Sequence, residues 1–143
     1  MSRAMPPRPV IHGPRKRANS TPRVLILSED AILGVYLRRE LGALLAEPWF
    51  AVFKSIDDYH ASSDGDVIHD MVIYCSNWHE KPEAIIQAIG RITLFCPEPE
   101  MKIVLYSSNR EVPSDARIVA VVQQTNENEL AEVISKLLCP EAI

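Results

Sequence analysis

The sequence predicts an α/β domain in which a doubly wound, five-stranded parallel sheet carries helices on both faces. Five short apolar runs of four or five residues are separated by polar or helical segments along the chain. Continuous apolar runs of this length are typical of strands buried on both faces, as in parallel sheets. Strands that alternate with helical segments connect through right-handed crossovers, and this pattern favours a single parallel sheet.

The first half of the pattern contains two expected strands and one long helix. The apolar run 24–27 is the first strand, and the segment 30–46 after it carries leucines at spacings of four, four and three. One stripe of this helix therefore faces a core, and Pro48 ends it. The second strand is expected at 50–53. The polar segment 57–66 that follows has room for little more than one helical turn.

The second half continues the alternation. The third strand is expected at 71–75, and the helix 81–95 after it carries isoleucines on one face. Strands four and five are expected at 103–106 and 118–122, and any helix in the connection around Pro113 must be short. The second and fourth helices of the doubly wound pattern are therefore expected to be reduced.

The last helix has the clearest pattern in the chain. Asn126 can cap its first turn, with Glu129 at the third helical position. The apolar residues after the cap follow the spacing of one helical face; they are Leu130, Val133, Ile134, Leu137 and Leu138.

Charge divides the chain into a basic arm and an acidic body. Residues 1–22 contain five prolines and few apolar residues, so we expect a disordered arm, followed by one globular domain at 23–143. Residues 1–23 carry six positive charges and no acid, whereas the other 120 residues have nine basic and nineteen acidic groups. An acidic body repels phosphate backbones, so nucleic acid would have to bind through the arm. The alternatives for the arm are a solvated leader and an electrostatic docking segment.

Several function classes have no support in the sequence. The three cysteines, at 75, 96 and 139, have wide spacings that predict reduced thiols, and no apolar run is long enough for a membrane span. We expect a cytoplasmic protein without membrane contact. The sequence has no Gly-rich phosphate loop, and Cys75 with His79 makes no full metal-ligand set. We therefore expect no cofactor, no metal and no enzymatic activity.

Polar residues close the first, third, fourth and fifth expected strands, where parallel folds place their ligands. With the length and the strand order, these strand ends make residues 23–138 resemble the CheY-like (flavodoxin-like) receiver domain of two-component response regulators. Functional receivers hold an acidic pair that binds magnesium, a phosphoacceptor aspartate, a Ser or Thr, and a lysine at these four strand ends. The resemblance implies a pocket formed by Ser28, Glu29, Asp30, Cys75, Ser107 and Gln123.

The implied pocket has lost its phosphorylation chemistry. Ser28 and Glu29 align with the acidic pair, so one acid of two remains in register. The run His-Asp-Met-Val-Ile-Tyr before Cys75 resembles the lead into the acceptor aspartate, and cysteine cannot form an acyl phosphate. Ser107 keeps the hydroxyl, whereas Gln123 aligns with the lysine. The resemblance therefore implies a degenerate receiver, or pseudo-receiver, and the short helices are similar to those of degenerate receivers in some LuxR-type transcription regulators.

The expected function is phosphorylation-independent regulation through a protein partner, such as a signalling protein or a transcription regulator. Trp78, in a polar loop directly after the pseudo-acceptor position, is the preferred contact residue. The resemblance to receivers, which dimerise or bind partners through one face, adds Tyr106, Val119, Gln124 and Glu132. The regulator would act as an adaptor, an antagonist or a dimerising subunit, the last of these as a homodimer. Two alternatives stay open: a ligand- or thiol-based sensor or enzyme on a flavodoxin-like scaffold, and nucleic-acid contact through the basic arm.

Overall fold

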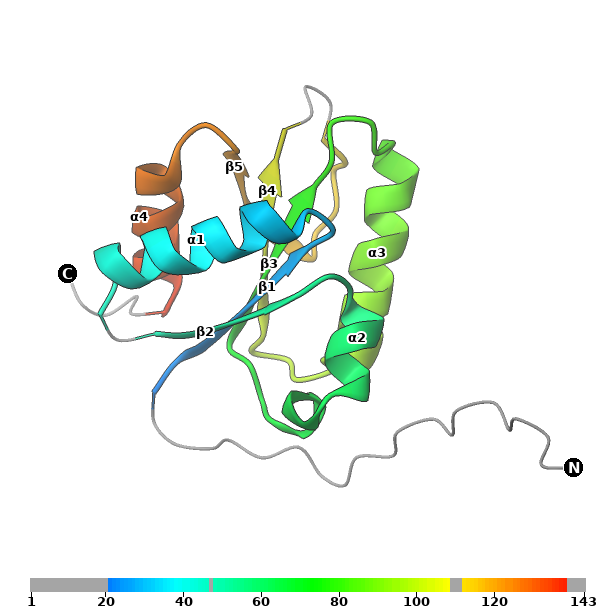
Figure 1. Cartoon of the computed structure of the whole chain (residues 1–143). Helices are drawn as coiled ribbons and strands as arrows, with labels where there is room; N and C mark the ends of the chain where they lie inside the picture. The colour runs from blue at the N-terminus through cyan, green and yellow to red at the C-terminus, as the bar shows by residue number, and fades with distance from the viewer. Residues whose placement is uncertain (1–20, 47, 109–111, 139–143) are drawn as a thin grey trace, which may run out of the picture.

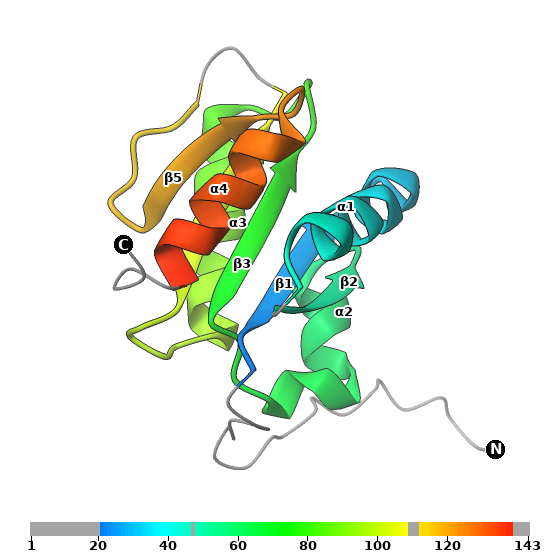
Figure 2. The same cartoon turned by 90° about the vertical axis from the view of Figure 1, so that its left-hand side faces the viewer.

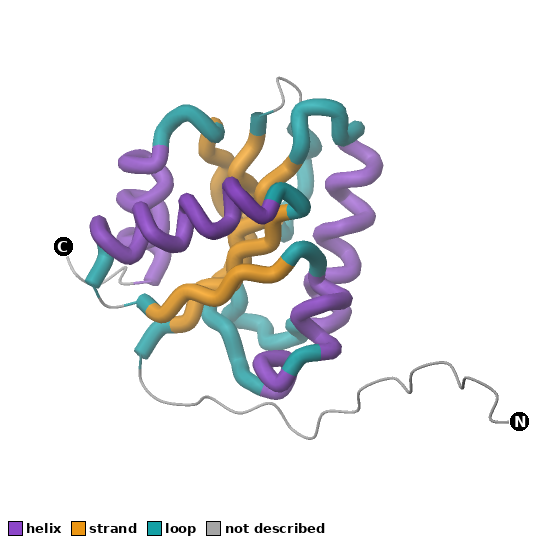
Figure 3. The backbone as a smooth tube through the Cα atoms, viewed as in Figure 1, coloured by secondary structure: helices purple, strands orange, loops and turns teal. Residues whose placement is uncertain are grey.

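The computed structural model describes residues 21–46, 48–108 and 112–138, so residues 1–20 of the expected arm and Cys139 lie outside the described residues. The strands are β1 (Arg23–Ser28), β2 (Trp49–Phe53), β3 (Met71–Ser76), β4 (Lys102–Ser107) and β5 (Ile118–Gln123). The helices are α1 (Ala31–Leu44), α2 (Ile56–Ala61), the 3₁₀ turn η1 (Ser63–Asp66), α3 (Pro82–Phe95) and α4 (Glu127–Leu138). Figure 3 shows this alternation of strands and helices along the chain.

The strands form one parallel sheet in the order β2-β1-β3-β4-β5, which confirms the predicted doubly wound α/β class. Helices α1 and α4 cover one face of the sheet, and α2 and α3 cover the other (Figures 1 and 2). The order reverses direction between β1 and β3, so the crevice at this switch point opens at the carboxyl ends of the strands.

Each face of the sheet packs its own core, because neighbouring residues of a strand point to opposite faces. On the α1 side, Ile26 and Ile73 pack with Leu37 of α1 and Ile134 of α4. On the α3 side, the buried strand residues pack against one face of α2 and α3; this second cluster includes Leu25, Val72, Leu105, Tyr59, Ile85, Ile89 and Ile92.

Local sequence explains where the helices begin. The Asp30 carboxylate accepts hydrogen bonds from the backbone N–H groups of Ile32 (3.0 Å) and Leu33 (3.2 Å) and so caps α1. Asn126 accepts from the N–H of Glu129 at 2.9 Å, which confirms the cap expected for the last helix. A proline occupies the first turn of α3, where its missing N–H costs nothing.

Two crossovers are reduced, as expected from the sequence. Helix α2 has six residues and is followed only by the 3₁₀ turn η1. Between β4 and β5, the described residues 112–117 contain no helix. This connection has only ten residues (108–117), whereas a helical crossover between parallel strands needs about a dozen or more. Among the described residues, every helix is too short or too polar to cross a bilayer.

Candidate functional site

The strand ends that the sequence singled out meet at one edge of the sheet. Ser28 at the end of β1 is in register with Cys75 on β3. On the other side, Ser76 of β3 is in register with Ser107 of β4, which is in register with Gln123 of β5. The structure therefore places four of the six predicted pocket residues at the carboxyl ends of adjacent strands, with Glu29 and Asp30 in the loop after β1.

Cys75, at the end of β3, is a buried thiol in apolar surroundings. Its side chain belongs to the core between the sheet and α1, and only 4% of the residue is exposed. Burial, and then the negative charge of Asp30, raise the pKa of the Cys75 thiol to about 12. Because the thiolate is the reactive form of cysteine, this environment suppresses nucleophilic chemistry at Cys75 at neutral pH.

Ser76 is a site residue that the sequence analysis missed. Its Oγ donates a hydrogen bond to Oγ of Ser107 over 3.2 Å, and both residues are buried. Ser108 adds a hydrogen bond from its Oγ to the Ser76 carbonyl, also at 3.2 Å. The available signal was the polar continuation of the third apolar run after Cys75, but only the register of β3 and β4 places Ser76 against Ser107.

The two adjacent glutamines differ from their expected roles. The Nε2 group of Gln124 donates to the carbonyl oxygens of Ser76 (2.8 Å) and Tyr106 (2.9 Å), and its backbone N–H donates to Ser107 (2.9 Å). Gln123, for which the sequence predicts the place of the receiver lysine, is exposed. The side chain that reaches across the strand ends is therefore that of Gln124, which the sequence analysis placed on a partner-binding face.

The acidic residues after β1 are held by local hydrogen bonds. Asp30 caps α1, so its carboxylate points to the helix N–H groups. Glu29 accepts a hydrogen bond from Nδ2 of Asn77 at 2.9 Å, which ties the loop after β1 to the loop after β3. Ser28 is buried and donates to the carbonyl of Asp30 at 2.7 Å. Within the described residues, no three His, Cys, Asp or Glu side chains group as metal ligands.

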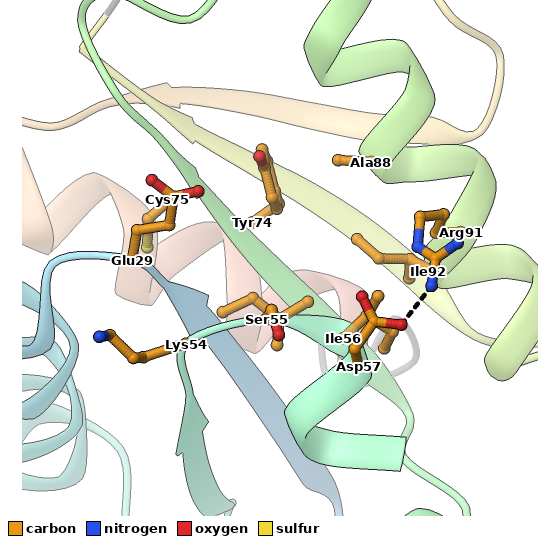
Figure 4. A pocket seen from close by; sticks show the side chains of 11 residues that line it. Glu29, Lys54, Ser55, Ile56, Asp57, Tyr74, Cys75, Ala88, Arg91 and Ile92 are labelled. Atoms are coloured by element: carbon orange, nitrogen blue, oxygen red, sulfur yellow. Dashed lines mark hydrogen bonds and ion pairs between the residues drawn. The ribbon is translucent and has the colours of Figure 1, made fainter. Parts of the chain in front are cut away.

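A cavity of about 150 Å³ lies beside these strand ends, between α2, α3 and the ends of β1, β2 and β3 (Figure 4). Charged groups of both signs line it: Glu29, Lys54, Asp57 and Arg91. Arg91 is hydrogen-bonded to Asp57 and lies over the ring of Phe95. Apart from Glu29 and Cys75, the sequence predicted none of the cavity residues as site residues, because most of them come together from α2, α3 and the end of β2.

Tyr74 closes the cavity on the sheet side. Its hydroxyl donates a hydrogen bond to Glu80. Burial, and then the hydrogen bond to the Glu80 carboxylate, raise the pKa of Tyr74 far above its ordinary value. The phenol therefore stays neutral, and it holds the loop after β3 against the sheet.

The predicted contact residues divide into exposed and buried groups. Trp78 is 78% exposed and Val119 is 48% exposed, and Glu132 is also exposed. Tyr106 is 1% exposed, so its prediction as a surface contact is wrong. Its side chain packs in the core on the α1 side, because alternate residues of β4 face opposite sides of the sheet.

Comparisons with known proteins identify the fold. No protein-family model matches the sequence, and no curated protein matches it. Solved structures do match, and several of them are response regulators or their receiver proteins.

A LuxR family DNA-binding response regulator from Silicibacter pomeroyi superposes with a TM-score of 0.66 at 16% identity, covering 84% of this chain and 93% of that one. A putative pilus assembly-related protein from Burkholderia pseudomallei gives 0.63 at 14% identity, with 86% and 93% covered. A response regulator from Thermotoga maritima gives 0.57 at 17% identity, with 82% and 98% covered. The chain therefore has the CheY-like receiver fold.

Proposed function

We propose that this chain is a phosphorylation-independent pseudo-receiver that regulates by binding a protein partner. The observation that carries the proposal is Cys75, a buried thiol with a pKa raised to about 12 at the end of β3. In the receiver fold this is the place of the phosphoacceptor. A thiol cannot form an acyl phosphate, so signalling through aspartyl phosphorylation would need a different residue. The proposal assigns no catalytic reaction to the chain.

The remaining strand-end groups support the same proposal. Phosphoryl transfer needs cationic groups that neutralise charge on the transferred group. The side chain that spans the ends of β3 and β4 is the neutral amide of Gln124, which is hydrogen-bonded to two backbone carbonyls. Asp30 is held in a helix cap. These residues stabilise one arrangement of the strand ends.

Trp78 provides the binding surface in this proposal. Large aromatic residues dominate binding energy at protein interfaces, and preorganised loops lose less entropy on binding. The Trp78 loop is preorganised by hydrogen bonds on both sides. The N–H of Asn77 donates to the Glu80 carboxylate (3.0 Å), and the N–H of Glu80 donates to the Asn77 carbonyl (3.0 Å). The Asn77–Glu29 hydrogen bond fixes this loop to the loop after β1.

Affinity capture from the native cell lysate with three baits tests this proposal: the full chain, Trp78→Ala and Leu94→Ala. Leu94 is a matched control because it is an apolar residue of α3 that is 69% exposed. We expect Trp78→Ala to weaken binding of one stoichiometric protein by roughly 30-fold, the effect of a hot spot worth about 2 kcal/mol. The Leu94→Ala bait should retain it. Equal capture by all three baits would contradict the proposal.

A fourth bait that lacks residues 1–22 separates protein binding from nucleic-acid binding. If the partner binds the folded domain, the shortened chain retains it. If the full chain captures only nucleic acid and the shortened chain captures none, the basic arm is the binding element and the pseudo-receiver proposal fails. Binding of that kind should weaken steeply with added salt.

A second candidate function is recognition of a small ligand in the cavity between α2 and α3. Its support is the position of the cavity at the switch point, with Lys54 and Arg91 on opposite sides of the opening (Figure 4). Thermal unfolding in the presence of small dicarboxylates tests it. Stabilisation that is lost in Lys54→Ala supports ligand binding, and an unchanged midpoint with every compound opposes it.

A further inference from the structure

Strand β2 is an edge of the sheet whose two faces are covered but whose outer backbone is not paired with any described strand. It pairs only with β1. Phe50 packs in the core on the α1 side and Ala51 in the core on the α2 side, so the two helices flank the strand (Figures 1 and 2). An extended chain that lay along this edge would therefore continue the sheet beside α1 and α2.

The backbone of β2 has two residues available for such pairing. The N–H of Trp49 donates to the Pro22 carbonyl at 2.8 Å and so points toward β1. Because backbone groups alternate in direction along a strand, the N–H and C=O groups of Phe50 and Val52 point away from β1. Edge strands are usually protected by charged residues or proline, and the β2 sequence, Trp-Phe-Ala-Val-Phe, contains neither.

Cations lie at the end of this edge and on its α1 side, although the chain after its basic arm is acidic. Lys54 directly follows β2 and is exposed. Helix α1 approaches β2 most closely at Gly34, where a Cβ would lie 2.7 Å from Cγ1 of Val52. Arg38 is exposed and follows Gly34 by one helical turn, so it lies on the same side of α1. Among the described residues, neither Lys54 nor Arg38 forms an ion pair.

Trp49 adds an exposed aromatic ring at the start of the edge. The residue is 43% exposed, and the guanidinium carbon of Arg23 lies 4.4 Å from the centre of its ring. Large aromatic residues are common anchors of interfaces, and a ring that is already held by a neighbour loses less entropy on binding. The edge therefore combines backbone hydrogen-bonding groups, an aromatic anchor and positive charge.

We propose that the β2 edge binds an extended, acidic segment of a partner protein, which adds to the sheet as a further strand. Hydrogen bonds to the backbone of Phe50 and Val52 supply affinity, and acidic side chains on the α1 side pair with Arg38 and Lys54. The charge of the edge opposes two other occupants. Residues 1–22 carry five positive charges and no acid, and a second copy of the chain would bring the same cations to the edge.

This inference goes beyond the proposed function, because it adds a second binding surface. The β2 edge lies on one side of β1, whereas β3, which carries the Trp78 loop, lies on the other. Loss of binding at the β2 edge would leave partner binding at Trp78 untouched.

Amide hydrogen exchange of the full chain tests strand addition, with a nine-residue peptide of alternating glutamate and valine as the probe. We expect the amides of Phe50 and Val52 to exchange at least tenfold more slowly when the peptide is bound, because their N–H groups then donate to it. The amide of Ala51 points toward β1 and should change less. The same peptide with lysine in place of glutamate should bind at least tenfold more weakly.

Three variants of the full chain locate the binding surface. Arg38→Glu should weaken binding of the acidic peptide by about fivefold. Arg39→Glu is the matched control, because Arg39 is also an exposed cation of α1 but is paired with Glu40 at 3.8 Å. Trp78→Ala should bind the peptide as the wild type does.

Four results would overturn the proposal. They are no binding of the acidic peptide to the wild type, binding without slower exchange at the two outward amides, equal affinity in Arg38→Glu and Arg39→Glu, and loss of binding in Trp78→Ala. The last result would place the peptide at the Trp78 loop and not at β2. The exchange measurement uses the wild type and does not depend on how the variants fold.

Discussion

The hydroxyl oxygens of Ser76 and Ser107 lie 3.2 Å apart, and join the carboxyl ends of β3 and β4 by a neutral hydrogen bond. This contact lies next to Cys75, for which the sequence predicts the place of the phosphoacceptor. The carbonyl of Ser76 is in turn satisfied by the amide of Gln124. The ends of β3 and β4 and the residue that follows β5 are therefore joined by neutral groups.

Gln124 is expected to contribute more to stability than its neighbour Gln123. Gln124→Ala leaves the carbonyls of Ser76 and Tyr106 without their side-chain donor, and should lower the free energy of unfolding by about 1–3 kcal/mol. Gln123→Ala changes an exposed side chain and should stay within about 0.5 kcal/mol of the wild type. Urea unfolding of both variants measures the difference. Equal effects would show that the hydrogen bonds of Gln124 carry no net stability.

Stability is expected to fall in alkaline solution through Cys75. Its pKa is about 12 in the folded chain, above the ordinary value of 9.0. Between these values the unfolded chain has released the proton and the folded chain has not, so each rise in pH favours unfolding. Burial also raises the pKa of Tyr74 and of Tyr106, so these two phenols contribute to the same loss of stability at high pH. Urea unfolding at pH 8 and pH 10 should show a smaller loss of stability in Cys75→Ala than in the wild type, and an identical loss would contradict this role.

Two glycines of α1 should respond in opposite ways to alanine. A Cβ at Gly34 would lie 2.7 Å from Cγ1 of Val52 on β2, so Gly34→Ala forces the branched Val52 side chain or the helix to shift. We expect a loss of about 1–3 kcal/mol. A Cβ at Gly42 meets no atom within 4 Å, so Gly42→Ala should add about 0.5–1 kcal/mol through helix propensity. Thermal unfolding of the two variants checks the sign of each change.

Asp115 should titrate far below an ordinary aspartate. Hydrogen bonds from the Arg117 guanidinium and from its backbone N–H lower the pKa of Asp115 to about 2. A carboxylate with a lowered pKa stabilises the folded chain above pH 3.8, and this contribution is lost as the pH falls toward 2. Carboxyl NMR titration should give the low value in the wild type and a value nearer 3.8 in Arg117→Gln. The same pKa in both proteins would exclude the Arg117 guanidinium as the cause.

The sequence was sufficient to predict the architecture. All five strands appear within one or two residues of the apolar runs, because strands buried on both faces are continuously apolar. The last helix and its Asn126 cap follow from spacing alone. The reduced second and fourth helices follow from segment length and polarity.

The details of the strand ends could not be predicted in the same way. A shift of one residue moves a side chain to the other face of a strand, so the sequence could not separate Gln123 from Gln124 or place Ser76 against Ser107. The direction of the Tyr106 side chain could not be predicted either, because it depends on the register of β4, which the apolar run does not fix. The cavity lined by Lys54 and Arg91 depends on the packing of α2 against α3, which no local pattern encodes.

The most direct test of phosphorylation-independent binding combines a phosphodonor with a binding measurement. The full chain is incubated with Mg²⁺ and acetyl phosphate, its intact mass is recorded, and its Kd for the protein captured through Trp78 is measured with and without this treatment. We expect an unchanged mass and an unchanged Kd. A stoichiometric phosphoryl adduct that changes the Kd would contradict the assignment of the chain as a pseudo-receiver.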